Sequence, residues 1–209
     1  MSTWIFRSLT AALAGLLLAG CGQAISLPFA TEPTGQTQFG GRKPLKEISL
    51  AGGQIKVSAP DGYCFDRRSI RHNAQRGFAV MARCDALGVR GFFGAHDLAI
   101  ATITTVPQAA GARAPTLAEL AKTGGDAKVL SRQNRDGLAL IRFDDGPHQV
   151  SDVSKTHWRG AFALNGQLVG LALYAPEGSD ALNSSGAALL SDLTRRTRKA
   201  SNLQAQLEE

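Results

Sequence analysis

Short stretches of this chain alternate apolar and polar residues, which is the two-residue period of a half-buried β-strand. Two of these stretches, 47–51 and 54–59, flank a Gly-Gly pair and predict a hairpin whose apolar residues face one another. Residues 77–84 form a more continuous apolar run, typical of a buried strand, and 97–106 predict another strand. The first half of the chain therefore reads mainly as β-structure.

Two further hairpins are predicted in the second half, and each has a turn signal at its centre. Residues 127–134 and 138–144 flank Asp136-Gly137, and residues 158–164 and 167–174 flank Asn165-Gly166. Asn-Gly is the stronger signal, because both residues accept the positive φ angles of a type I′ turn. The strand 167–174 is apolar almost throughout, so we expect it at the centre of a sheet with both faces covered.

Three helices are predicted from capping residues and from the helical period. The first is short, at 66–72 with Asp66 as its N-cap, and the second follows the capping box Thr116–Glu119 and stops at a Gly-Gly pair. The third runs over 186–199, with apolar residues Ala187, Leu189, Leu190 and Leu193 on one side. Basic residues at 195–199 are expected to complement its C-terminal dipole, and a polar, frayed tail is expected at 201–209.

This element order predicts one α+β domain over 47–200, with a central antiparallel sheet of about six to seven strands and two or three helices packed on it. The order, with APDGYC at 59–64, TLAELAK at 116–122 and the closing helix, resembles the Mog1/PsbP-like fold. The segments GYCFD, ARCDAL and HWRGAFALNGQLVGLALY also resemble a group of exported alphaproteobacterial proteins to which no activity is assigned. That resemblance implies no catalytic residues.

Residues 1–20 have the three parts of an export signal: Arg7, an apolar stretch at 9–18, and small residues before Cys21. Leu18-Ala19-Gly20-Cys21 resembles the lipobox of bacterial lipoproteins, which implies diacylglyceryl transfer to the Cys21 thiol and cleavage before it. The residue after the cysteine is Gly22 and not Asp, which in lipoproteins of this kind favours location at the outer membrane over the inner membrane. Residues 21–46, rich in Pro, Gly, Thr and Gln, predict a lipidated flexible tether.

Cys64 and Cys84 are the two cysteines that remain after Cys21. An even pair in an exported protein favours a structural disulfide. A metal site or a redox pair is the alternative, but each ordinarily requires closer spacing or neighbouring histidines.

Composition excludes a disordered chain, since 44% of residues are hydrophobic and 19% are charged. The net charge of +6 is partly concentrated in Arg67, Arg68, Arg71, His72, Arg76 and Arg83. These residues are a candidate patch for an anionic partner, and the alternative is an ordinary solvated surface. Phe92 and Phe93 lie between glycines, where they are expected either to contact a partner or membrane or to cover the sheet edge.

A search for chemistry finds no recognisable catalytic constellation. His72, His96, His148 and His157 form no HExxH pair, no GxSxG motif occurs, and Asp144-Asp145 before Gly-Pro is typical of a turn. We therefore expect no enzyme, cofactor, metal or nucleic-acid partner. The predicted function is that of a lipid-anchored protein facing the periplasm, which binds an envelope protein. The alternative is a carrier of a small ligand or lipid, with a pocket between sheet and helix; a hydrolase ranks third.

Overall fold

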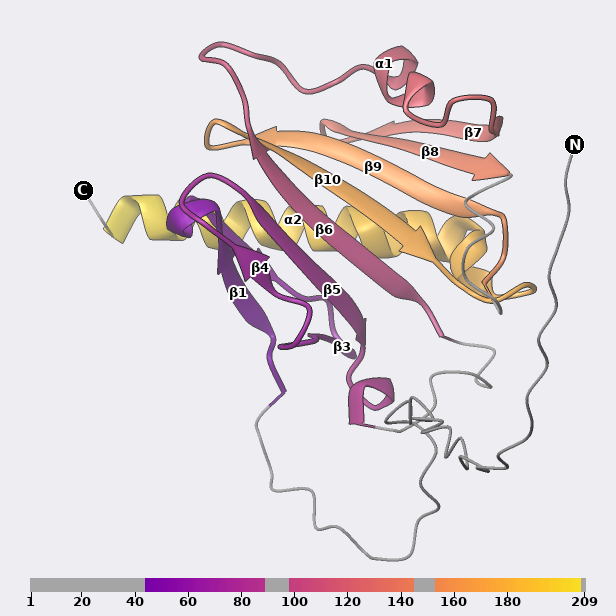
Figure 1. The fold of residues 1–209 in the computed structure, drawn as a ribbon, viewed down its shortest axis with the longest axis horizontal. Helices are drawn as coiled ribbons and strands as arrows, with labels where there is room; N and C mark the ends of the chain where they lie inside the picture. Colours follow the sequence, from indigo (N-terminus) through magenta and orange to yellow (C-terminus); the bar gives the residue numbers. More distant parts are fainter. Residues whose placement is uncertain (1–43, 89–97, 145–152, 208–209) are drawn as a thin grey trace, which may run out of the picture. The chain divides into compact units, whose positions relative to one another are not determined.

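The computed structural model describes residues 44–88, 98–144 and 153–207, and its strands form one large antiparallel sheet and a separate hairpin (Figure 1). The strands are β1 (Glu47–Leu50), β2 (Ile55–Ser58), β3 (Tyr63–Phe65), β4 (Arg71–His72), β5 (Gly77–Arg83), β6 (Ile100–Pro107), β7 (Lys128–Arg135), β8 (Leu138–Asp144), β9 (His157–Leu164) and β10 (Gln167–Tyr174). The helices are α1 (Leu117–Lys122) and α2 (Ser184–Leu207), with short 3-10 turns η1 (Ala51–Gly53), η2 (Ala86–Gly88) and η3 (Asp180–Leu182).

The order of the large sheet is β3-β5-β6-β10-β9-β8-β7, and the two-residue β4 pairs with β5 beside β3. Every pairing in it is antiparallel, and β1 and β2 form the separate hairpin. The predicted α+β class, with about seven strands in one antiparallel sheet and two helices, is confirmed.

Turn chemistry fixes the two long hairpins. Asn165 and Gly166 between β9 and β10 have φ angles of 48° and 69°, and Asp136 and Gly137 between β7 and β8 have 51° and 73°. Two consecutive positive φ angles match the right-handed twist of the flanking strands. Both hairpins therefore form at the turns that the sequence predicted.

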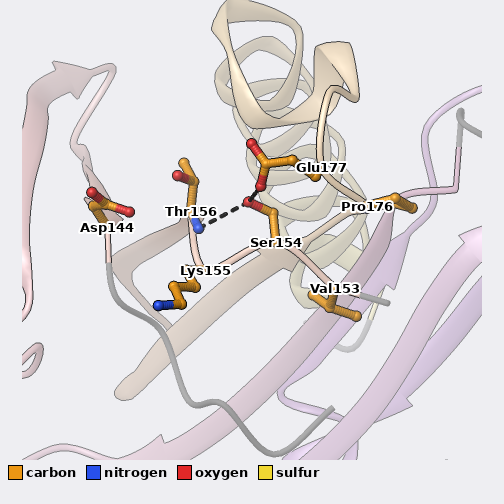
Figure 2. A pocket seen from close by; sticks show the side chains of 7 residues that line it. All are labelled: Asp144, Val153, Ser154, Lys155, Thr156, Pro176 and Glu177. Carbon is orange, nitrogen blue, oxygen red and sulfur yellow. Dashed lines mark hydrogen bonds between the residues drawn. The ribbon is translucent and has the colours of Figure 1, made fainter. Parts of the chain in front are cut away.

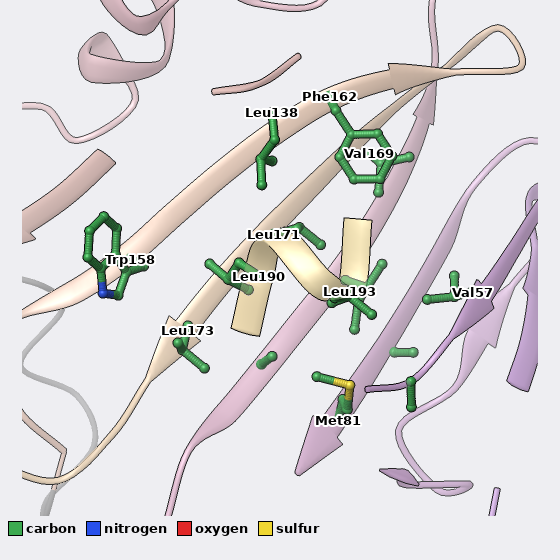
Figure 3. Close-up of a cluster of buried hydrophobic side chains, with 14 of the residues drawn as sticks. Val57, Met81, Leu138, Trp158, Phe162, Val169, Leu171, Leu173, Leu190 and Leu193 are labelled. Atoms are coloured by element: carbon green, nitrogen blue, oxygen red, sulfur yellow. The ribbon is translucent and has the colours of Figure 1, made fainter. Parts of the chain in front are cut away.

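One face of the sheet is covered by α2 together with the β1–β2 hairpin, and this is the main core (Figure 3). Val169, Leu171 and Leu173 point toward that face from β10, and Leu190 and Leu193 of α2 pack in the same cluster. All five side chains are at most 5% exposed. Burying this continuous apolar layer supplies most of the driving force for folding.

The opposite face carries a smaller cluster beneath α1, which packs on β7, β8 and β9. The Thr116 hydroxyl accepts from the Glu119 amide while the Glu119 carboxylate accepts from the Thr116 amide, so the predicted capping box is present. That backbone hydrogen bond, with those from the Thr116 hydroxyl and Arg113, lowers the pKa of Glu119 to about 2. Gly124 follows α1, and a Cβ there would lie 2.3 Å from the Phe143 ring, so the close contact requires glycine.

The predicted helix at 66–72 is wrong. After β3 the chain makes a turn and continues as β4, because its polar groups bond to β5. The Asp66 amide donates to the Val80 carbonyl at 2.9 Å, and the Ser69 hydroxyl accepts from the Val80 amide at 2.8 Å. Asp66 still caps its own turn, since its carboxylate accepts from the Arg68 amide at 3.0 Å. Tertiary pairing has overridden the local helical signal.

Helix α2 continues to Leu207, well beyond the end predicted near Lys199, so the frayed tail from Ser201 is a second error. Ser201 is only 2% exposed, and its hydroxyl accepts from the Lys56 amide of β2 at 3.0 Å. Arg198 lies mid-helix and donates to the Asp136 carbonyl in the β7–β8 turn, so it serves tertiary packing and not the helix dipole. No helix among the described residues is both long and apolar enough to cross a membrane.

Strand β10 is central, as predicted, but the expectation that both of its faces are covered is wrong. Residues at 169, 171 and 173 are buried against α2, whereas Leu168, Gly170, Ala172 and Tyr174 on the other face are only partly buried. Just before β1, the Leu45 carbonyl accepts from the Phe65 amide at 2.8 Å, so this residue already contacts the domain.

Candidate functional site

The disulfide connects Cys64 of β3 to Cys84 just after β5, with Cα atoms 4.9 Å apart. The predicted disulfide between Cys64 and Cys84 is therefore confirmed. It is present in place of the alternatives, a metal site or a pair of free redox-active thiols. The loop that it closes contains every arginine of the predicted basic patch. The disulfide therefore ties the edge of the sheet to the segment that carries the positive charge.

Four of those arginines, with His72, lie along the outer edge of β5, and we call this set the basic edge: Arg67, Arg68, Arg71, His72 and Arg76. All five are exposed. Their backbone is held by β5 and by the side chain of Asn73, which accepts from the Gln75 and Arg76 amides at 2.9 and 2.8 Å. The charge is thus carried by a hydrogen-bonded segment.

Arg83, the fifth predicted arginine, differs from the others. It ends β5 and pairs with Asp85, with 2.8 Å between Nη2 and Oδ2. The hydrogen bond from Arg83 lowers the pKa of Asp85, so that carboxylate stays ionised and offsets the arginine. Arg83 therefore adds little to the positive potential of the basic edge.

A hollow lies at one end of the sheet, where the chain enters β9 and leaves β10 (Figure 2). Its volume is about 540 Å³, and its lining includes Asp144, Ser154, Lys155, Thr156 and Glu177. The Ser154 hydroxyl donates to the Glu177 carboxylate at 2.5 Å and accepts from the Thr156 amide at 3.1 Å. Because the Ser154 amide also donates to the Ala175 carbonyl, these bonds close the end of the sheet.

A second hollow of about 240 Å³ shares Thr156 and Glu177 with the first and borders the start of α2. Arg142 enters it from β8, donating from Nη1 to the Leu182 carbonyl at 3.2 Å and to the Asn183 side chain at 3.1 Å. Its guanidinium also lies 5.8 Å from the centre of the Trp158 ring. Arg142 thus connects the sheet to the start of α2 and is largely committed to structural contacts.

His157 is buried directly beside these hollows but does not form a catalytic pair. Its ring stacks between Phe143 and Tyr174, with ring centres 5.6 and 5.4 Å away. Nδ1 contacts the Lys155 carbonyl at 3.1 Å, and Nε2 has no hydrogen-bond partner among the described residues. Burial lowers the pKa of His157, with a smaller contribution from Arg159, so the neutral imidazole is favoured. Within the described part of the chain, His157 therefore forms no hydrogen bond with Ser154 or with an Asp.

The other predicted residues are distributed as follows. His72 is exposed on the basic edge, and Asp144 ends β8 at the rim of the first hollow. Across the described parts of the chain, no group of three His, Cys, Asp or Glu side chains is arranged to hold a metal ion. The remaining predicted positions lie outside the described residues: Cys21, Phe92, Phe93, His96, Asp145 and His148.

Sequence reasoning missed one surface, which we call the open face. It lies opposite α2 and consists of the outward residues of β5, β6 and β10: Phe78, Val80, Ile100, Thr102, Thr104, Val106, Ala172 and Tyr174. Helix α1 lies over β7 and β8, away from β5 (Figure 1). Thr104 is exposed and Val106 is 38% exposed, while the other six are partly buried. The alternation of DLAIATITTV could have indicated a half-open strand, but not which neighbours share the surface.

No family model matches the chain, and no curated protein matches it. The chain is similar in structure to the Ran-binding protein Mog1p of Saccharomyces cerevisiae, at 12% identity and a TM-score of 0.40, over 73% of this chain and 91% of that one. Mog1p gives its name to the fold group that the element order resembles. The likeness concerns the arrangement of elements and says nothing about what this chain binds.

Proposed function

We propose that this chain is a lipid-anchored protein of the bacterial envelope whose domain faces the periplasm and binds another envelope protein without catalysing a reaction. The anchor is the thioether on Cys21, for which the Leu-Ala-Gly-Cys motif is the support. The disulfide between Cys64 and Cys84 is consistent with an oxidising compartment such as the periplasm. Gly22 after the cysteine, in place of Asp, supports location at the outer membrane.

The open face is the observation that supports binding. Apolar side chains such as Phe78, Val80 and Tyr174 gather there with small threonines, and no described helix packs over β5 and β6. Protein interfaces typically combine an apolar centre with a polar rim, and aromatic residues are enriched in them. The expected partner therefore presents an apolar strand or helix face that lies across β6.

The contacts of two described residues support the non-catalytic part of the proposal. A hydrolytic relay requires a base within hydrogen-bond reach of a nucleophile. Ser154 instead donates to Glu177, and among the described residues the one hydrogen-bond partner of the His157 ring is the Lys155 carbonyl. The alternative of a lipid carrier gains no support, because both described hollows lie at the end of the sheet and no residue of the main core between the sheet and α2 lines either of them.

A photoreactive amino acid at Thr104 tests the binding proposal in intact cells. We expect irradiation to yield one defined adduct with an envelope protein, and Val106→Asp to reduce its yield, because the interface would then bury a charge. The matched control is the same amino acid at Lys128, which is exposed on β7 at the opposite edge of the sheet. The same adducts from both positions, or none from Thr104, would refute binding at the open face.

Palmitate labelling tests the anchor separately. We expect the chain to be labelled in growing cells and the Cys21→Ala variant to lose the label. Undiminished labelling of that variant would show that the lipid is attached elsewhere.

A further inference from the structure

The basic edge has a high density of positive charge, and three of its arginines have no ion-pair partner in the described part of the chain. Between Arg67 and Arg76 there are four arginines and no Asp or Glu. The nearest acidic residue in sequence, Asp66, uses its carboxylate to accept from the Arg68 amide. Among the described residues, no carboxylate forms an ion pair with Arg68, Arg71 or Arg76.

The segment is also held close against the sheet. It follows β5 from Val80 to Gly77, a distance of about 10 Å along a strand. Arg71 lies opposite Phe78, and its Nη1 donates to the carbonyls of Arg68 and Ile70 at 2.6 and 2.9 Å. The remaining guanidinium donors of this arginine are available to solvent or to a ligand.

We propose that the basic edge binds the anionic headgroups of membrane phospholipids. Arg68, Arg71 and Arg76 would contact several phosphates at once, since guanidinium groups bind phosphate oxygens in a bidentate manner. The three arginines line neither hollow and are all exposed, so they are arranged for a surface of many headgroups and not for one enclosed ligand.

An acidic protein partner is less well matched to this surface. Protein interfaces depend on buried apolar or aromatic anchors, and the exposed stretch 71–76 consists of polar and charged residues with a single Ala. Adsorption of basic segments to anionic membranes requires no such anchor, because each Arg near the surface strengthens it by about fivefold. The inference rests on the envelope location proposed above and adds a second membrane contact to the anchor.

Vesicle sedimentation with the secreted, disulfide-bonded Cys21→Ser chain tests the basic edge without the lipid. We expect the chain to bind vesicles of phosphatidylcholine mixed with phosphatidylglycerol but not vesicles of phosphatidylcholine alone. Binding should weaken steeply with salt, because exposed charges are screened over about 10 Å at 0.1 M ionic strength. Equal binding to both vesicle types would overturn the proposal.

Two matched triple variants then locate the binding surface. Replacing three arginines of the basic edge should weaken binding to the mixed vesicles on the order of 100-fold, from about fivefold for each charge; these changes are Arg68→Gln, Arg71→Gln and Arg76→Gln. An equal charge change near or on β7, at the opposite side of the sheet, should have little effect; these changes are Lys122→Gln, Lys128→Gln and Arg135→Gln. Equal losses in the two variants would overturn the assignment.

A third variant guards against misfolding. Replacing the same three arginines by lysine keeps the charge, so binding should remain within a few-fold of the starting chain, and a large loss would overturn the electrostatic explanation. Palmitate labelling distinguishes failure of the proposed anchor from failure of the proposed headgroup binding. If Cys21→Ala leaves the labelling unchanged while the vesicle results are as expected, the anchor assignment is wrong and the binding assigned to the basic edge still holds.

Discussion

Replacing Cys64 and Cys84 together by alanine should lower the free energy of unfolding by about 3 kcal/mol. The two cysteines are 20 residues apart in sequence, so the disulfide closes a loop of that size in the unfolded chain. The loss of chain entropy for such a loop is about 11 cal/mol/K, which at 25 °C gives about 3 kcal/mol. Cys64 is only 2% exposed, so its removal also costs a small amount of packing.

Urea unfolding of the secreted chain measures this difference. Tryptophan fluorescence is a suitable signal because Trp158 lies in the main core and is 1% exposed. The midpoint should fall in the double variant, and the slope should change little if the unfolded states expose similar surface. The reduced and alkylated wild-type chain is the matched control, since it loses the same covalent link without losing the sulfur atoms.

A loss below about 1 kcal/mol in both samples would refute this reasoning, because the chain-entropy term would then be offset or absent. Such a result would mean that the unfolded chain is already restricted without the disulfide. The restriction would come from residual pairing of β3 with β5, which in the folded chain places Tyr63 opposite Arg83 and Phe65 opposite Met81. A loss confined to the alkylated sample would instead point to a clash from the alkyl groups.

Three further predictions concern buried positions. Leu190→Ala, at a 0% exposed position of the main core, should cost about 3 kcal/mol in the same urea experiment, while Arg195→Ala on the exposed side of α2 should stay within about 0.5 kcal/mol. Gly186→Ala should cost at least about 1 kcal/mol, because its Cβ would lie 1.9 Å from the Ala181 carbonyl oxygen; an unchanged midpoint would contradict that contact. His157 has a pKa lowered below its ordinary value of 6.5, so the unfolded chain binds more protons and stability falls as pH drops through about 6.5. His157→Phe should flatten this pH dependence in urea titrations between about pH 5 and 7; an unchanged slope would assign it to another group.

The elements predicted correctly from the sequence are those in which local chemistry and tertiary packing agree. Asn165-Gly166 forms a tight turn in any context that brings two strands together, and Thr116 with Glu119 caps α1 through contacts three residues apart. The helix predicted at 66–72 does not form. Asp66 does cap a turn, but the hydrogen-bond partners of the backbone that follows lie on β5. A capping residue specifies a turn, and only distant residues decide whether a helix follows.

The end of α2 was misplaced for a similar reason. The basic residues after Thr194 were assigned to the helix dipole, yet Arg196 pairs with Asp61 at 2.8 Å and Arg198 lies 5.2 Å from the centre of the Phe162 ring. Neither contact is visible in sequence, because both join residues far apart in the chain. The absence of Gly or Pro after Lys199 was the available signal that the helix continues.

The candidate surfaces also differ in how far the sequence alone could predict them. The disulfide and the charge of the basic edge follow from residue type and spacing, so the sequence predicted both. The hollow at Ser154 and Glu177 depends on the meeting of two segments around β9 and β10, and no pattern in either segment indicates it. The open face was missed because strand order had to be known before Phe78, Thr104 and Ala172 could be placed on one surface.

The lengths of the two helices explain why one sheet face is closed and the other is half open. Seven strands spaced by about 4.8 Å make a sheet about 29 Å wide. Helix α2 has 24 residues and is about 36 Å long, so it can extend across the whole sheet. Helix α1 has six residues and is about 9 Å long, enough for two or three strands, and it occupies β7 to β9. Neither of the two described helices therefore covers the apolar residues of β5 and β6 on that face, because α1 is short. A partner that supplies an equivalent apolar surface would complete the layer.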